Sequence, residues 1–326
     1  MGVTDLAGLG NPLKKLITVV SSAIGRLSKS HFDKKDIDTE AYRIKTLAKA
    51  VADASQFSEN IEYCEKGLII KPNMLPEVPI ENRIQERLNF QEEKKQLNIE
   101  NVTIFAANEL RNEQSVSEEP LSEDWTTRFF RIVEDVSNEE MQMLWGKILA
   151  GEIKQPNSFS LRTLEVVRNL SQKEAETFLR VARFAIHRNN SYALFTGGSI
   201  TSLAEHYKIK FEDIALLIEA GLLQPGDFTQ YQLLQQPEDT RNPFVFGNIV
   251  MVVEIKANTP TLKMPIRLFT STGNELMRLV ITENPSLDYL KYIAKSIIKK
   301  DAVDVKYGYI TGYSGDNIMH TPLLEF

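Results

Sequence analysis

The sequence contains a single cysteine and few histidines. Cys64 is the only cysteine among 326 residues, which excludes an intramolecular disulfide and a zinc site built from several cysteines. The four histidines (His31, His187, His206 and His320) are scattered, and no two have the spacing of three or four residues that a metal pair on a helix needs. The sequence therefore predicts no metal and no cofactor. A single cysteine also fits the reducing environment of a cytoplasm.

An excess of positive charge is missing too. The chain has 38 Lys and Arg against 44 Asp and Glu, which gives a net charge of -6 and a pI of about 5.5. A protein that coats nucleic acid needs a cationic surface to displace counterions from phosphates, so we do not expect nucleic acid as a general partner. With 42% hydrophobic and 25% charged residues, the composition is that of a globular protein with about two or three domains.

Near the N-terminus there is no hydrophobic run long enough to cross a membrane. The longest uncharged run in this segment, Leu16 to Gly25, has ten residues, whereas a spanning helix needs about 20. Lysine, threonine and serine side chains interrupt the apolar residues, so the segment is not expected to be a signal peptide.

The N-terminal segment does have the pattern of an amphipathic helix. Asn11 is a suitable N-cap and Pro12 a suitable first residue. Apolar residues follow at intervals of three and four and form one stripe: Leu13, Leu16, Ile17, Val20, Ala23, Ile24 and Leu27. Residues 1 to 30 carry four basic side chains against Asp5 alone, a combination that suits an anionic membrane surface. A helix that docks on its own protein or on a sister subunit is the interpretation that the stripe favours over a membrane surface, because most such stripes belong to a core. The predicted membrane- or partner-binding residues are Leu13, Lys14, Lys15, Leu16, Ile17, Val20, Ile24 and Leu27.

Helical patterns continue through the middle of the chain. A helical run is expected from Glu40 to Gln56, and a long charged helix or helical pair from Ile80 to Glu113. Capping boxes at Ser137 with Glu140 and at Ser171 with Glu174 predict further helices of a compact bundle. The first of these helices is expected to end at Gly151, and the second to continue to His187. Both tryptophans are expected to be core residues of the bundle. We expect four parts: the amphipathic segment 1–30, a helical region 31–116, a helical bundle 117–190 and a winged-helix-like domain 191–326.

The last part resembles a helix-turn-helix followed by strands. Residues 199–225 predict two helices around a turn, with a stop at Gly221, and apolar strand-like runs follow at 243–257 and 263–269. A capping box at Thr272 with Glu275 predicts one more helix. A DNA-reading helix needs donors for phosphates and guanine edges, but the second helix offers Glu212, Asp213 and Glu219 and no Lys or Arg. We therefore expect this unit to serve structure or protein contacts.

One strand ends in a pattern that also occurs in metal-dependent nucleases. Glu254 and Lys256 form an E-x-K sequence after an apolar run, and Asp239 is the upstream carboxylate that could share a metal with Glu254. The same spacing is common by chance on amphipathic strands. These three residues are the alternative catalytic set.

The segment Glu123 to Ser171, "EDWTTRFFRIVEDVSNEEMQMLWGKILAGEIKQPNSFSLRTLEVVRNLS", resembles bacterial proteins of the family called domain of unknown function 2806. The upstream "RLNFQEEKKQLNIENV" and the N-terminal "LGNPLKKLITVVSSAIGRL" resemble the layout of that family. The resemblance implies a bacterial or phage cytosolic setting and, by association, a part in phage defence. It brings no established catalytic residues.

Taken together, the sequence predicts a mainly α protein with a smaller α+β part: a helical bundle, a winged-helix-like unit and a short C-terminal α/β tail. We expect it to be non-enzymatic and to act through contacts with another protein or with itself as a homo-oligomer. Its N-terminal helix would hold it at the inner face of a membrane. A metal-dependent nuclease, a winged-helix DNA-binding regulator and a structural oligomer are the alternatives.

Overall fold

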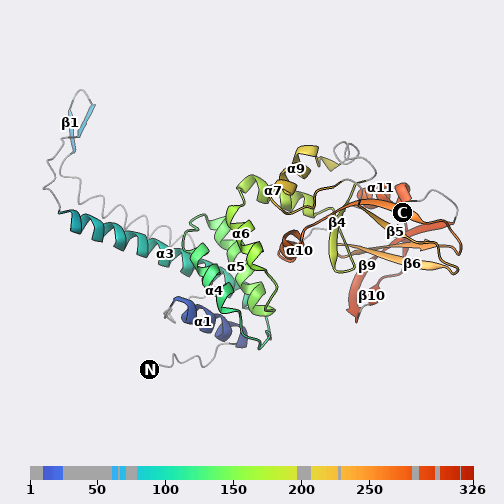
Figure 1. Cartoon of the computed structure of the whole chain (residues 1–326), viewed down its shortest axis with the longest axis horizontal. Coiled ribbons are helices and arrows are strands. Elements are labelled where there is room, and N and C mark those ends of the chain that lie inside the picture. Colours follow the sequence, from blue (N-terminus) through green and yellow to red (C-terminus); the bar gives the residue numbers. More distant parts are fainter. Residues whose placement is uncertain are drawn as a thin grey trace. The chain divides into compact units, whose positions relative to one another are not determined.

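A computed structural model describes residues 10–24, 61–64, 67–70, 79–196, 207–226, 229–280, 286–297, 302–315 and 317–326. The chain forms two compact units, Met1–Pro156 and Asn157–Phe326. The boundary between them falls inside the segment 117–190 that was expected to form one bundle, while the four-part division stays a prediction. The described residues form nine helices and a nine-stranded antiparallel sheet (Figure 1). The protein is therefore a mixed α and β protein.

The first unit is built on helices. α3 (Ile80–Leu110) packs against α5 (Glu139–Lys154), and α1 (Asn11–Ile24) contacts α3, α4 (Glu123–Val133) and α5. A short antiparallel hairpin, β1 (Ile61–Cys64) with β2 (Gly67–Ile70), precedes α3. The predicted long helix is confirmed as one continuous helix, and the predicted helical run 40–56 lies outside the described residues.

Aromatic side chains form the centre of this unit. Phe129 of α4 is stacked on Trp125, with ring centroids 5.0 Å apart, and meets the edge of Trp145 of α5 at 5.6 Å. All three rings are buried, and such contacts stabilise beyond the buried area alone. The expectation that both tryptophans are core residues is confirmed.

Two boundaries of α5 differ from the sequence prediction. The helix is capped by Asn138, whose side-chain oxygen accepts a hydrogen bond from the backbone N–H of Met141 at 3.0 Å, and not by Ser137. Ser137 instead accepts from the amide of Asn98. At the other end, the helix continues through Gly151 to Lys154. Tertiary packing explains the extension, because Glu152 and Ile153 in the added turn are buried.

The second unit combines five described helices with the sheet. The helices are α6 (Leu161–Asn169), α7 (Gln172–Ala182), α9 (Phe211–Glu219), α10 (Ser271–Met277) and α11 (Leu287–Ile297). The strand order is β10-β9-β7-β6-β3-β4-β8-β5, with β11 also paired to β9. The strands are β3 (Ala185–Arg188), β4 (Ser191–Phe195), β5 (Gln230–Leu233), β6 (Thr240–Phe246), β7 (Ile249–Ile255), β8 (Leu262–Leu268), β9 (Val303–Ser314), β10 (Asn317–His320) and β11 (Leu324–Glu325).

The sheet is larger than the predicted α+β part. β9, expected as part of a separate C-terminal tail, pairs with β7 from Val303 to Tyr309 and so joins the same sheet as the winged-helix-like strands. β7 is buried along almost its whole length. It lies between β6 and β9 in the sheet, and a strand buried on both faces needs other elements of the fold to cover those faces. The winged-helix interpretation stays a prediction, because residues 197–206 at its first helix lie outside the described residues.

Two helix boundaries in this unit also needed correction. α7 begins with the predicted capping box of Ser171 and Glu174, but it ends at Ala182, and residues 185–188 form β3 instead of a continued helix. α10 is capped by Thr270, whose hydroxyl oxygen accepts from the backbone N–H of Gly273 at 3.0 Å, and not by Thr272. Glu275, the other half of the predicted box, binds elsewhere: its carboxylate accepts from the backbone N–H of Ser160 at 2.7 Å.

α3 and α5 lie very close together at Gly146. A Cβ atom at this position would overlap Phe105 of α3, and the backbone nitrogen of Ala106 lies 3.0 Å away. In an ordinary helix interior, replacing glycine by alanine is stabilising by up to about 1 kcal/mol. We expect Gly146→Ala to do the opposite and to destabilise the first unit by about 1–3 kcal/mol through overpacking. The measurement is urea unfolding followed by tryptophan fluorescence, with Met143→Ala on the exposed side of α5 as the control.

Candidate functional site

The N-terminal helix lies inside the first unit with its apolar side packed against other helices. Leu16 and Val20 are fully buried, and Ile17 and Val19 nearly so. Val19 was not part of the predicted stripe, whereas Ala23, which belonged to it, is exposed. Of the other predicted residues, Leu13, Lys14 and Ile24 are half-buried, and Leu27 lies outside the described residues.

Lys15 fastens this helix to the rest of the unit. Its ammonium group donates hydrogen bonds to three backbone carbonyl oxygens: Ser117 at 2.8 Å, Glu119 at 2.8 Å and Ile153 at 3.2 Å. Partial burial lowers the pKa of Lys15 from its usual range, although Glu119 and Glu152 nearby act in the opposite direction. The sequence predicted Lys15 among the residues that would bind a membrane surface or a partner. In the folded unit, it is a bridge between α1, the segment before α4 and the end of α5.

The three residues of the alternative catalytic set lie around one hollow of the second unit. Asp239, Glu254 and Lys256 line a hollow of about 600 Å³ together with Arg241 and Asp304. Cross-strand register explains the grouping, because Glu254 of β7 is opposite Arg241 of β6 on one side and opposite Asp304 of β9 on the other.

The carboxylates of this hollow already have protein partners. Glu254 accepts from Arg241 at 2.8 Å and lies 3.6 Å from the ammonium of Lys306, which also pairs with Asp304 at 2.7 Å. Asp239 accepts a hydrogen bond from the backbone N–H of Ala257 at 2.8 Å. A divalent cation would have to displace two cations from Glu254, and within the described residues no three His, Cys, Asp or Glu side chains are grouped so that they could hold a metal ion. This donor set does not fit the metal that nuclease chemistry needs.

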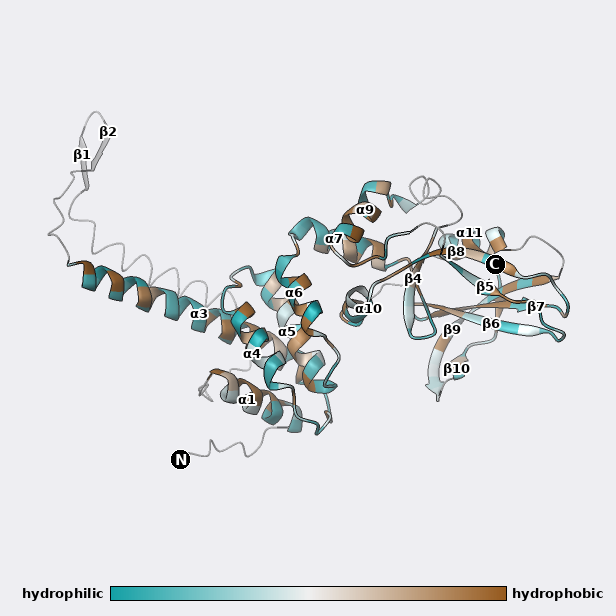
Figure 2. Ribbon diagram, viewed as in Figure 1, coloured by the Kyte–Doolittle hydropathy of each residue, from teal (hydrophilic) through white to brown (hydrophobic). Residues whose placement is uncertain are grey.

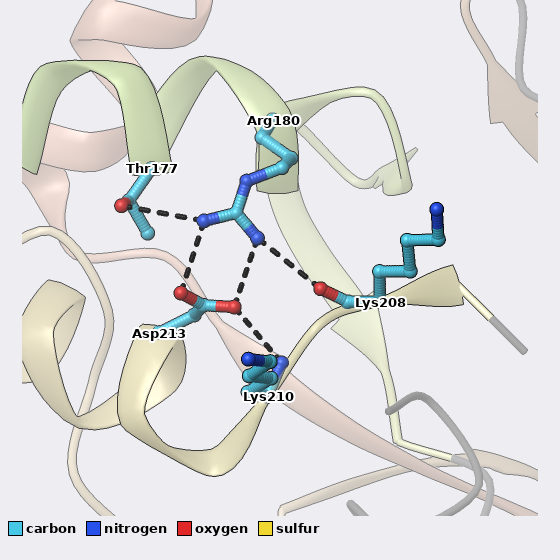
Figure 3. A network of polar contacts seen from close by, with 5 residues as sticks. All are labelled: Thr177, Arg180, Lys208, Lys210 and Asp213. Carbon is cyan, nitrogen blue, oxygen red and sulfur yellow. Dashed lines mark hydrogen bonds and ion pairs between the residues drawn. The ribbon is translucent and has the colours of Figure 1, made fainter. Parts of the chain in front are cut away.

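A second polar network joins α7 to the start of α9 (Figure 3). The guanidinium of Arg180 donates to both carboxylate oxygens of Asp213, at 2.9 and 3.0 Å, and also to the carbonyl oxygen of Lys208 at 3.2 Å. Asp213 also accepts from the backbone N–H of Lys210 at 2.9 Å. This hydrogen bonding raises the pKa of Arg180 and lowers the pKa of Asp213 from their usual values.

The network gives Asp213, an acidic residue of the predicted second helix of the winged-helix-like unit, a structural role. Asp213 is held by an arginine 33 residues away, so nothing in local sequence spacing pointed to the pair. The position of Asp213 three residues after the cap of α9 was the one available signal, since an acid there satisfies N-terminal N–H groups. Glu212 and Glu219 remain exposed on α9, which leaves this helix acidic toward solvent.

No helix among the described residues is both long and apolar enough to cross a membrane. At these sites, Lys15, Glu254 and Asp213 connect helices or strands of their own unit. The structure thus defines the class of the protein: a mixed α and β protein with an α-helical unit and a unit built on an antiparallel sheet.

Residues 82–294, well over half of the chain, match the family described as "Protein of unknown function (DUF2806)". The chain belongs to this family, and the resemblance seen in the sequence is confirmed. No curated protein and no solved structure is significantly similar to the chain.

The role of Lys15 can be tested by replacing its ammonium group with an apolar end. Lys15→Met keeps the length of the side chain but leaves three carbonyl oxygens without their donor, which should cost about 1.5–3 kcal/mol. We expect the amides of residues 10–24 to exchange with deuterium at least about tenfold faster. Lys14→Met, on the same turn, should leave their exchange unchanged. Equal effects of the two substitutions would contradict the anchoring role.

The pair of Arg180 and Asp213 predicts a pH-dependent contribution to stability. Because the folded-state pKa of Asp213 is lowered, its contribution is complete above the ordinary pKa of aspartate and is lost as the pH falls through the folded-state pKa. At neutral pH, Asp213→Asn should reduce the unfolding free energy of the second unit by about 1 kcal/mol, since half-exposed ion pairs contribute little. The melting temperatures of the wild type and of Asp213→Asn should differ at pH 7 and converge in acid. The control Glu212→Gln should leave the melting temperature unchanged at either pH.

Proposed function

We propose that this protein is non-enzymatic and acts through protein–protein contacts made by the N-terminal half of α3. The single observation that carries the proposal is an apolar face of α3 that continues past the helices that cover it. From Asn98 onward this face is buried against the rest of the first unit. Before Lys95, every described residue of the helix is exposed.

The exposed part of this face carries a line of apolar side chains, as expected of a contact surface. Ile80, Ile84 and Leu88 follow one another at intervals of four residues and are 58%, 44% and 42% exposed. On a helix with 3.6 residues per turn, they lie in line with the buried residues Val102 and Ala106 further along. Figure 2 shows hydrophobic positions among hydrophilic ones along the part of α3 that extends beyond α4 and α5.

Charges beside this stripe suit a protein partner. Arg83 and Arg87 lie along one side of it and Glu81 and Glu92 along the other. Apolar residues flanked by charges of both signs are typical of a helix that lies against another helix, where the charges set the choice and orientation of the partner. A stripe facing an anionic membrane would have cations on both sides.

The N-terminal helix is less suited to be the contact surface. Its apolar side chains already stabilise the first unit, at roughly 1.5–3 kcal/mol for each fully buried large side chain. Moving α1 onto a membrane would rebury Leu16 and Val20 but would expose the surfaces of α3, α4 and α5 that they cover. Peripheral membrane binding and a part in phage defence stay predictions. The winged-helix-like part of the second unit and the four-part domain division also stay predictions. In the proposal, these other parts of the chain serve as a scaffold for the contact surface on α3.

Position-specific photo-crosslinking in cells tests the contact. A benzophenone amino acid at position 84 should give a discrete adduct heavier than the 37.1 kDa chain, and the same amino acid at position 89, on the opposite side of α3, should not. The adduct from position 84 should be lost when Leu88→Glu is added. Asn82→Glu, also on the opposite side, should leave it intact.

Two outcomes would overturn the proposal. The first is an adduct formed equally from positions 84 and 89, which would show that the stripe has no preference over the polar side. The second is crosslinking that joins position 84 only to its own chain. In that case the double variant Ile84→Glu, Leu88→Glu should also have a lower melting temperature, because it loses an internal contact.

A further inference from the structure

The sheet of the second unit curls so that its edge strand β5 comes close to β6. In the strand order, β3, β4 and β8 lie between these two strands. In a flat sheet, strands four positions apart would be separated by about 19 Å, since neighbouring strands lie about 4.8 Å apart. The ring centroids of Tyr231 on β5 and Phe244 on β6 are, however, only 6.0 Å apart. The sheet therefore has a concave face, and both rings lie on it.

α11 packs against one end of this concave face. Further along β6, Phe246 meets the ring of Tyr289 of α11 edge-on, with centroids 6.2 Å apart, and both side chains are fully buried. Phe244 and Phe246 share the same face, because side chains alternate along a strand. At the other end of the face, Tyr231 and Asn242 are only half-buried. Solvent therefore reaches the concave face at this end, and the open mouth of a curled sheet is a common place for ligand sites.

A positive charge lies at this half-buried end. Arg188 is the last residue of β3, and its guanidinium carbon lies 4.4 Å from the ring centre of Phe244 and 5.6 Å from that of Tyr231. Both rings hold the guanidinium by cation–π contacts. Phe244 is fully buried and so lies on the interior side of the charge. Arg188 itself is half-buried.

This guanidinium has no anionic partner in the part of the chain that the structure describes. It has five N–H donors, and its one hydrogen bond to a described residue goes to the side-chain oxygen of Asn242 at 3.2 Å. Burial lowers the pKa of Arg188, although Tyr231 acts in the opposite direction. The hydroxyl of Tyr231 is buried and also lacks a hydrogen-bond partner among the described residues. Partly buried charges and buried donors are costly without partners, so an anion would stabilise this end of the sheet.

We propose that this end of the concave face binds a small organic carboxylate, with Arg188 as its counterion. The planar guanidinium presents parallel N–H groups that match the two oxygens of a carboxylate. One cation balances one negative charge, whereas a phosphate dianion needs a second cation, and the side chains that contact Arg188 are neutral. The half-buried ring of Tyr231 offers apolar contact to the organic part of the ligand. Its hydroxyl, whose pKa the charge of Arg188 acts to lower, is a second donor close to the guanidinium.

This site lies in the second unit and goes beyond the contact proposed for α3. The experiment is ligand-observed NMR of the full chain with a panel of small carboxylates (benzoate, phenylacetate and hexanoate), each beside its neutral amide. We expect at least one carboxylate to bind, and its amide to bind at least about tenfold more weakly, because only the acid brings a charge to Arg188. Inorganic phosphate should not displace the carboxylate.

Two variants and a matched control locate the binding. Arg188→Met keeps an apolar side chain but removes the charge, so the acid and its amide should bind alike. Tyr231→Phe removes the second donor and should weaken the acid without changing the amide. Lys263→Gln removes a cation at an exposed position of β8, the strand beside β5, and should change neither. Saturating acid should raise the melting temperature of the wild type and of Lys263→Gln, but not that of Arg188→Met.

Two results would overturn the carboxylate site. The first is a wild-type chain that binds no acid of the panel better than its amide. The second is a preference for the acid that survives in both Arg188→Met and Tyr231→Phe, since the acid then binds elsewhere. Neither result changes the crosslinking expected from position 84. Unspecific crosslinking from that position would in turn overturn the proposed function and leave the carboxylate site standing.

Discussion

The need to cover one apolar face of α3 governs the first unit. This helix has 31 residues, and helical stability in proteins comes mainly from packing of an amphipathic face. Over its C-terminal half, α1, α4 and α5 supply that packing, and Gly146 allows α5 to approach closely enough to do so. Over its N-terminal half, the described helices supply none. The same physical demand thus explains the core of the unit and its exposed surface.

At three places among the described residues, charged side chains connect secondary structure elements. Lys15 joins α1 to two distant backbone segments, Glu254 joins three strands through its cationic neighbours, and Arg180 with Asp213 joins α7 to α9. A partly buried charge is costly unless it is hydrogen-bonded or paired, so these partners offset the cost of burying Lys15, Glu254 and Asp213. Glu254 of the E-x-K pattern is engaged by cations of the neighbouring strands.

Exposed apolar surface is found where a helix or strand extends beyond the elements that pack against it. α3 extends beyond α4 and α5, and β9 extends beyond β7. In both places, a regular element continues with an apolar pattern after its cover within the described residues has ended. An extended helix face and an open strand edge bind partners by different means, side-chain packing for the one and main-chain pairing for the other.

Local elements were determined largely by the sequence itself. The long helix from Ile80, the helix after Ser171 with its capping box, and the family of the chain could all be recognised without a structure, because apolar periodicity and caps act over a few residues. Tertiary structure decided the rest. It ended α7 at Ala182 so that β3 could join the sheet, and it extended α5 through Gly151 so that Ile153 could be buried.

The predicted sites illustrate the same division. The amphipathic character of α1 follows from its residues, but only the fold decided that Leu16 and Val20 face helices of their own unit and that Lys15 meets backbone carbonyls. Asp239, Glu254 and Lys256 do lie around one hollow, as the spacing suggested, yet Arg241 and Lys306 reach Glu254 from neighbouring strands. Local sequence specifies which elements form, since propensities and caps are short-range. Which charge meets which partner depends on strand order and helix packing, and these bring together residues that the sequence keeps far apart.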